Sequence, residues 1–220
     1  MTHFLSPVFE TGFFESAQVH TALLVGAVVA VVAASVGSFA VLRGQSFAGE
    51  ALADIGTTGG SGAFLLGVGP LWGFLALGSA AAAPMELIGV QRARGRDLAT
   101  GAELAAARGV HVRLVGALYL LALVLAVALA SLTIGTILGT ALLVGPGAAS
   151  MSLTARPVRA ALAAAVLAVL AMWLGIVLAY DSYYWPPHGR GWPVSFFVVT
   201  LVFIFYLLSG LPRMWRERRA

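Results

Sequence analysis

The fold is decided by one stretch of the sequence, residues 49–64, which reads GEALADIGTTGGSGAF. Apolar segments of about 20 residues lie on both sides of it, each long enough to cross about 30 Å of hydrocarbon as a helix. The stretch itself carries Glu50 and Asp54, followed by a run of Gly, Thr and Ser. It therefore predicts a membrane-spanning helix with two carboxylates, which are costly within a bilayer and usually functional.

The composition of the whole chain is that of a membrane protein. Of its 220 residues, 60% are hydrophobic and 10% are charged, and the mean hydropathy is +0.95. A soluble domain is about half apolar and a quarter charged. We therefore expect an all-α fold, a polytopic transmembrane helical bundle with about seven spans. The expected spans are 19–42, 47–67, 70–90, 114–131, 134–153, 158–180 and 194–211.

The arginines predict the sidedness of this bundle. All thirteen basic residues are arginine, and with the N-terminus outside, twelve of them fall in cytoplasmic loops or in the C-terminal tail. Only Arg190 then lies outside. Because positive residues concentrate on the cytoplasmic side of a membrane, we expect an external N-terminus and a cytoplasmic C-terminus. The net charge of +4 thus indicates the lipid bilayer, and no nucleic acid, as the partner.

The first 18 residues differ from the rest of the chain. They contain Glu10 and Glu15, four Phe and no Lys or Arg, so they lack the basic start of a signal peptide. Their aromatic residues predict a segment that lies at the outer membrane interface. We therefore divide the chain into an external interfacial segment, 1–18, and a transmembrane domain, 19–220.

The stretch from Gln91 to Arg113 is the one long polar loop of the predicted topology, and it lies on the cytoplasmic side. Thr100 is a suitable N-cap, Glu103 follows three residues later, and Gly109 suits a helix end, so the loop contains a predicted short helix. From the residues alone this helix is either a docking element for a cytoplasmic partner or a solvated connector.

Glu50 and Asp54 lie four residues apart, so a helix places them on one face, one turn from each other. Two negative charges there repel, and we expect one of them to be protonated or a cation to lie between them. Carboxylate oxygens suit hard or borderline divalent metals. Three alternatives stay open: Glu50 as a first-turn acid favoured by the helix dipole, Asp54 as a structural hydrogen-bonding residue, and the pair as a proton relay.

The Gly, Thr and Ser residues that follow the pair are poor helix formers. They predict either a small-residue face for close helix packing or a broken helix whose freed carbonyls line a cavity. Pro146 predicts a kink in the fifth span, with Ser150 bonding a freed backbone group. The remaining candidates are expected to be structural or solvated: His20, Glu86, His111 and His188.

The chain has no HExxH, GxSxG or Walker A motif and no cysteine, so nothing in it indicates a protease, an ATPase or a thiolate metal site. Four segments instead resemble, in order, the membrane permease subunit of metal-ion ABC importers of the zinc/manganese/iron type. They are GSFAVLRGQSFAGEALADIGTTGGSGAFLLGVGP from Gly37, ELAAARGVHVRLVGALYLLAL from Glu103, IGTILGTALLVGPGAASMSL from Ile134, and AYDSYYWPPHGRGWPVSF from Ala179. The resemblance covers nearly the whole chain after residue 18.

This resemblance implies a multi-pass permease of the bacterial cell membrane, not itself an enzyme, that works as a homodimer and holds no permanent cofactor. Its cargo would be a divalent metal: manganese, zinc or iron. An extracellular metal-binding lipoprotein would deliver the ion. A cytoplasmic ABC ATPase would dock on the segment that resembles the family's coupling helix, with contacts at Glu103, Leu104, Arg108 and Gly109.

In the family, an acidic residue and a histidine four positions later on the second span are proposed to contact the metal. The matching positions are Glu50 and Asp54, so the acid is retained and an aspartate replaces the histidine. A site with oxygen ligands alone shifts the expected preference from zinc towards manganese or iron.

The chain also departs from the family in length. The sequence RARGRDLATG runs directly into AELAAARGV, as if about 70 residues, long enough for further spans, were absent near Gly101. The absence of an even number of spans would preserve the predicted sidedness. Two alternatives to an ATP-driven importer therefore remain: an ATP-independent carrier or channel for cations or protons, and a non-transporting truncated remnant.

Overall fold

The computed structural model describes Phe13 and residues 15–94, 109, 111–154, 156–185 and 190–217. These residues form seven α-helices and one short 3-10 helix, with no strand among them. The helices are α2 (Ala17–Leu42), α3 (Ser46–Leu65), α4 (Pro70–Arg94), α6 (Val112–Ile134), α7 (Thr136–Leu153), α8 (Pro157–Asp181), η1 (Ser182–Tyr184) and α9 (Val194–Glu217). The all-α prediction is confirmed, and each predicted span corresponds to one α-helix.

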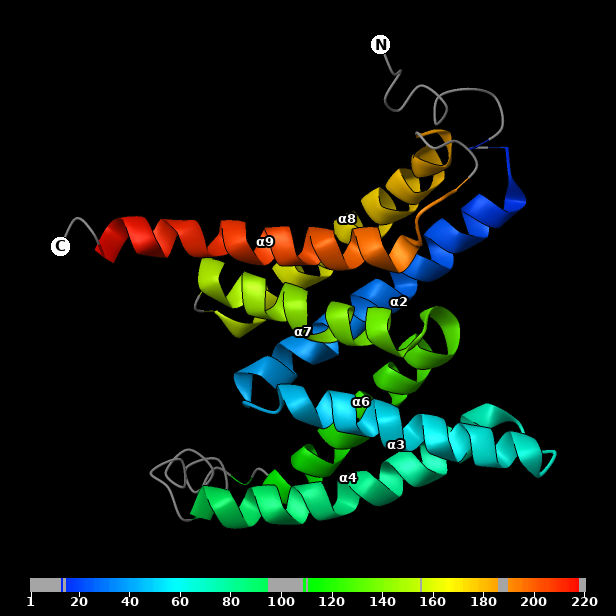
Figure 1. Cartoon of the computed structure of the whole chain (residues 1–220). Coiled ribbons are helices and arrows are strands. Elements are labelled where there is room, and N and C mark those ends of the chain that lie inside the picture. The colour runs from blue at the N-terminus through cyan, green and yellow to red at the C-terminus, as the bar shows by residue number, and fades with distance from the viewer. Residues whose placement is uncertain are drawn as a thin grey trace.

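Successive helices run in opposite directions through the bundle, as the predicted topology requires. In Figure 1 the end of α3, the start of α4 and the junction of α6 with α7 lie on the right-hand side. The ends of α2, α4, α7 and α9 lie on the left-hand side, which is the side of the predicted cytoplasmic arginines. Gly135 alone separates α6 from α7, with φ 91° and ψ 159°, a backbone conformation that is open to glycine.

The helices form two groups that meet through α6 and α7. One group consists of α2, α7, α8 and α9, which pack on one another, and the other is the antiparallel hairpin of α3 and α4. Helix α6 packs against α2 and α7 of the first group and against both helices of the hairpin. Figure 1 shows the hairpin at one end of the bundle and α8 with α9 at the other.

Glycine allows the helices to approach one another closely. A side chain at Gly37 of α2 would collide with the backbone of Leu143 in α7, whose Cα would lie 2.9 Å from the added carbon. On the hairpin, Gly59 and Gly73 each lie against the other's carbonyl group. Because lipid tails are as apolar as leucine, membrane helices associate through close packing of this kind. The backbone itself therefore forms much of the contact between helices.

Four helical segments are long and apolar enough, by length and composition, to cross a membrane, and they correspond to α2, α6, α7 and α8. Shorter apolar helices cover Pro70–Met85 in α4 and Val194–Gly210 in α9. Helix α3 is 20 residues long but is not among these segments, because its carboxylates, glycines and hydroxyls lower its hydropathy. Large apolar side chains elsewhere on the surface, such as Leu24 and Val158, suit contact with lipid.

We predict that Gly37→Ala destabilises the bundle by about 2–3 kcal/mol, because the added methyl group meets a backbone that cannot move aside. The thermal midpoint of the detergent-purified chain measures this effect. Gly62→Ala is the matched control, since a side chain at Gly62 of α3 would meet nothing within 4 Å. Replacing a helical glycine in open space favours the helix by about 1 kcal/mol. A Gly37→Ala midpoint equal to that of Gly62→Ala would contradict the close contact of α2 with α7.

Candidate functional site

Helix α3 has two faces of opposite character. Its buried face packs against α4, α6 and α7 and carries small or aliphatic residues: Gly49, Leu52, Ala53, Gly56 and Gly60. Its other face carries Glu50, Asp54, Thr58 and Ser61, which are all exposed in this chain. Their spacing of four, four and three residues places them in one row along the helix. We call this row the polar face of α3.

The glycine-rich part of α3 is a packing surface. The helix continues without a break from Ser46 to Leu65. A side chain at Gly56 would overlap the ring of Phe74 in α4, and Gly59 lies against Gly73. The prediction of close packing is therefore correct, and the alternative of a broken helix is wrong for this stretch.

The hydroxyl groups next to the pair are bonded within α3. Thr57 and Thr58 both donate to the carbonyl oxygen of Asp54, at 2.9 and 3.0 Å, and Ser61 donates to the carbonyl of Thr57 at 2.9 Å. Each hydroxyl oxygen keeps lone pairs that are directed away from the backbone. The polar face therefore offers neutral oxygen acceptors over its outer half and carboxylates over its inner half.

Neither carboxylate of the pair has a partner within the described residues. Glu50 and Asp54 form no ion pair or side-chain hydrogen bond there, and no group of three or more His, Asp or Glu residues occurs in that part of the chain. The pair supplies four carboxylate oxygens, whereas divalent cations with oxygen ligands take six to eight. The remaining ligands of any such ion would come from outside this pair, for example from water or a second chain.

The other sequence-predicted residues lie apart from this face. Gly109 is exposed and has φ +80°, a conformation typical of the residue after a helix, whereas Glu103, Leu104 and Arg108 lie outside the described residues. His20 and His111 are exposed near opposite ends of the bundle, and His188 and the side chain of Glu86 also lie outside the described part.

Pro146 is buried inside α7, which continues without interruption on both sides of it. Ser150 was predicted to bond a backbone group freed by the proline. It instead donates to the carbonyl of Gly147 at 2.9 Å, three residues before it in the same helix, so that prediction is wrong. The carbonyl that the proline leaves without an amide partner belongs to Leu142, one turn earlier.

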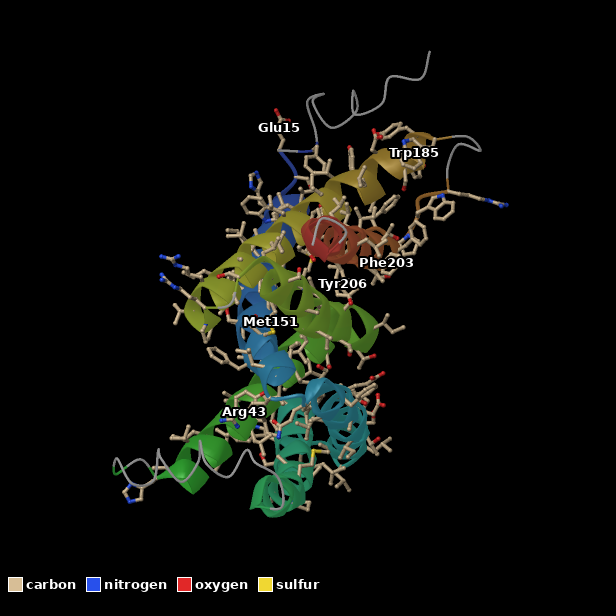
Figure 2. The ribbon with its side chains drawn as sticks, turned by 90° about the vertical axis from the view of Figure 1, so that its left-hand side faces the viewer. Glu15, Arg43, Met151, Trp185, Phe203 and Tyr206 are labelled. Carbon is tan, nitrogen blue, oxygen red and sulfur yellow. The ribbon has the colours of Figure 1, made fainter. Side chains whose placement is uncertain are left out.

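Sequence reasoning missed an ordered cap at the outer end of α8. Asp181 is 1% exposed and accepts a hydrogen bond of 2.8 Å from the indole Nε1 of Trp185. Ser182 is also buried, and its hydroxyl oxygen accepts from the backbone amide of Trp192 at 2.9 Å. The spacing of four residues between Asp181 and Trp185 was the available signal. Figure 2 shows Trp185 near the top of the view, far from Arg43 in the lower part of the molecule.

Comparisons with known proteins place this geometry in context. A sequence model described as the ABC 3 transport family matches residues 16–104 and 98–210. The two matched segments meet within 98–104, which contains Gly101, where the sequence predicts that residues are absent. A structure described as PsaBC from Streptococcus pneumoniae in complex with Fab is similar, with a TM-score of 0.73 and 20% sequence identity. The similarity covers 90% of this chain and 93% of that one. A search of curated proteins finds no match.

We predict that the polar face of α3 contacts water in the assembled protein. The chain lacks cysteine, so Thr58→Cys introduces a single thiol, and a charged thiol reagent should modify it at least about tenfold faster than Val166→Cys. Val166 is the control because it is 59% exposed on the apolar surface of α8. A thiol in lipid does not ionise, so it reacts slowly. Equal, slow reaction at both positions would mean that the polar face is dry.

Proposed function

Because the chain belongs to the ABC 3 transport family, we propose that it carries a divalent transition-metal ion, manganese, zinc or iron, along the polar face of α3. Family membership gives the coarser function: the chain is the membrane permease of an ABC importer of metal ions, and a multi-pass protein of the bacterial membrane. Hydrolysis of ATP belongs to a separate subunit. The observation that supports this path is the pair of unpartnered carboxylates, Glu50 and Asp54.

The order of groups along α3 suits an ion that enters from outside. The helix begins at Ser46 on the cytoplasmic side, so an incoming ion meets Ser61 and Thr58 before Asp54 and Glu50. From Ser61 to Glu50 the helix rises about 16 Å, roughly half the thickness of the hydrocarbon layer. The hydroxyl oxygens would first replace some of the water ligands of the ion. The carboxylates further in would then attract the ion more strongly, so its attraction to the path would increase inwards.

The pair would bind an ion through its charges and still allow the ion to be released. A divalent cation relieves the repulsion between Glu50 and Asp54 and offsets their cost in the membrane, which is about 2.5–3.5 kcal/mol for each acidic group. The pair alone leaves part of the coordination shell to water or to another chain. Such an incomplete shell favours release when the helices around it move.

A second copy of the chain is the proposed cover for the polar face. A row of acids and hydroxyls cannot face hydrocarbon without a large cost, because lipid offers no hydrogen-bond partners. In a twofold homodimer with the two α3 helices facing each other, each copy would contribute Glu50 and Asp54. Four carboxylates around one axis would give an ion more ligands than either chain provides alone.

The donor set favours manganese or iron over zinc. Zinc sites are usually tetrahedral and rich in imidazole or thiolate, whereas carboxylate and water ligands suit manganese. The polar face presents only oxygen donors. The exposed histidines His20 and His111 are not grouped with Glu50 or Asp54.

Two further partners complete the proposed importer. A cytoplasmic ABC ATPase would dock on the segment that contains Glu103, Leu104, Arg108 and Gly109, and an extracellular metal-binding lipoprotein would deliver the ion to the outer side. Gly109 precedes the N-cap of α6 by two residues, so the docking segment leads directly into this membrane helix. ATP-dependent movement of that segment would then change the access of the path from one side to the other.

We predict that Glu50→Gln/Asp54→Asn abolishes metal retention. The purified parent is equilibrated with manganese, zinc and iron together, and its bound metal is measured by mass spectrometry after rapid desalting. We expect one metal to be retained by the parent and its content to fall at least about tenfold in the double variant, because the variant has lost both anionic ligands. Glu15→Gln is the control, since Glu15 is an exposed acid outside the helices.

Either of two results would count against this path. If parent and double variant hold the same metal content, the carboxylates are not ligands. If neither protein holds metal but the double variant loses uptake of protons into liposomes, the pair is a proton relay, and the chain handles protons at this position.

We also predict that Glu103→Arg/Leu104→Asp prevents association with the ATPase subunit. Reversing a charge and placing a charge in an apolar contact should reduce the co-purified ATPase at least about tenfold. Arg159→Gln is the control, because Arg159 is an exposed cytoplasmic residue at the start of α8 and outside the docking segment. Full ATPase recovery with the double variant would place the docking surface elsewhere.

A further inference from the structure

We propose that Arg43 and Tyr119 are positioning residues that connect α6 to the start of α3. Their contact would pass a displacement of α6 to the helix that carries Glu50 and Asp54. This inference rests on the proposed function, because it assigns a route by which movement at the ATPase docking segment reaches the ion path. It assigns Arg43 and Tyr119 a role in transport, although neither residue would touch the ion.

The turn between α2 and α3 is tightly closed. The amide of Gln45 donates to the carbonyl of Ala40 at 2.8 Å, and the amide of Gly44 donates to that of Val41 at 3.0 Å. With Gly44 at φ 65°, this is the Schellman pattern that ends many helices. The amide of Ala48 then bonds the carbonyl of Gln45 at 2.9 Å and begins α3. A force on Arg43, the C-cap of α2, therefore reaches α3 through two residues of fixed geometry.

Arg43 connects this turn to α6. Its guanidinium carbon lies 4.2 Å from the centre of the Tyr119 ring, which is the geometry of a cation–π contact. Figure 2 shows Arg43 beside α6, where this helix passes the start of α3. The contact joins residues that are far apart in the sequence, so it is a tertiary link between the turn and α6.

The start of α6 adjoins the docking segment. His111 is the N-cap of α6, and Gly109 precedes it by two residues. Tyr119 lies two turns into the helix, about 10 Å from its first residue by helical rise. Because α6 is continuous from Val112 to Ile134, a tilt or shift at its start moves Tyr119 with it.

Two buried polar atoms of this junction lack a partner within the described part of the chain. They are the hydroxyl oxygen of Tyr119 and the side-chain oxygen Oε1 of Gln45. Buried polar atoms in proteins nearly always have partners, and those that do not make a local arrangement less stable. A movement of α6 relative to the turn that gave either atom a partner would be favoured, so this junction is a place where a movement can be taken up.

The contact could also serve only to stabilise the fold, a role that we call a staple. A staple and a contact that transmits movement differ in the consequences of their loss. If the contact transmits movement, its loss separates ATP hydrolysis from events at α3 while the complex stays assembled. If it is only a staple, its loss lowers stability and reduces all activities together. The experiment therefore follows α3 and α6 separately.

The chain has no cysteine, so a single environment-sensitive fluorophore can be attached at Phe47→Cys or at His111→Cys. Phe47 is 83% exposed in the first turn of α3, and His111 is exposed at the start of α6. Each labelled chain is assembled with its ATPase in liposomes, and the response to ATP is recorded. In the parent we expect ATP to change the signal at both positions. In Tyr119→Leu and in Arg43→Gln we expect the signal at His111 to persist and the signal at Phe47 to fall at least about fivefold.

Conservative variants serve as controls for the chemistry of the contact. Arg43→Lys keeps a cation over the ring and should keep most of the Phe47 response. Tyr119→Phe keeps the ring and removes the unpartnered hydroxyl, so it should keep the response and raise the thermal midpoint. Because Arg43 is exposed, Arg43→Gln tests the inference even if Tyr119→Leu does not fold.

The proposal is overturned if the Phe47 signal persists in Arg43→Gln, or if it never responds in the parent while His111 does. It is also overturned if Arg43→Gln lowers the signals at Phe47 and His111 equally, which is the result expected of a staple. Metal import by the same liposomes is measured in parallel. A parent that imports no metal, with a Phe47 response that still depends on Arg43, would refute the proposed cargo and leave the transmission intact.

Discussion

The two groups of helices come closest at Leu143, a residue of α7 that fills the space left by glycines on two other helices. Its backbone lies against Gly37 of α2, and its side chain lies over Gly49 of α3. A side chain at Gly37 would push α7 away from α2, whereas a side chain at Gly49 would meet the end of the Leu143 side chain. Because lipid gives no hydrophobic force between apolar helices, this close fit and the packing of α6 on α3 and α4 together set where the hairpin lies. The direction in which the polar face of α3 points follows from it.

The composition of α3 reflects two demands on one helix. Its glycines let α4 and α7 approach closely, and its acids and hydroxyls on the opposite side give it a chemistry that no other described helix has. Both features reduce the stability of the helix as an isolated span, since glycine weakens helices and carboxylates resist burial. The surrounding helices offset this cost by packing against α3, and they pack only against the face that carries its glycines.

The sequence predicted the helices closely because the bilayer imposes general rules of apolar length on membrane helices. It also predicted that Glu50 and Asp54 share a face, which follows from helical geometry. It did not predict which face of α3 is buried, because the glycines and the polar residues have the same periodicity. Nor did it predict the contact of Arg43 with Tyr119, which depends on the tilt of α6. The residues Glu103, Leu104 and Arg108 remain a prediction, since they lie outside the described part.

The hairpin of α3 and α4 has a consequence for how the protein is made. During synthesis α3 leaves the ribosome before α4, yet by composition it is the less suited of the two to remain in lipid. The mutual contact of Gly59 and Gly73 gives α3 a surface to bind as soon as α4 emerges. The two helices therefore have reason to enter the bilayer together, as a preassembled pair. The cell's insertion machinery would then have to retain α3 until its partner arrives, so the speed of translation through α4 becomes part of the folding of this protein.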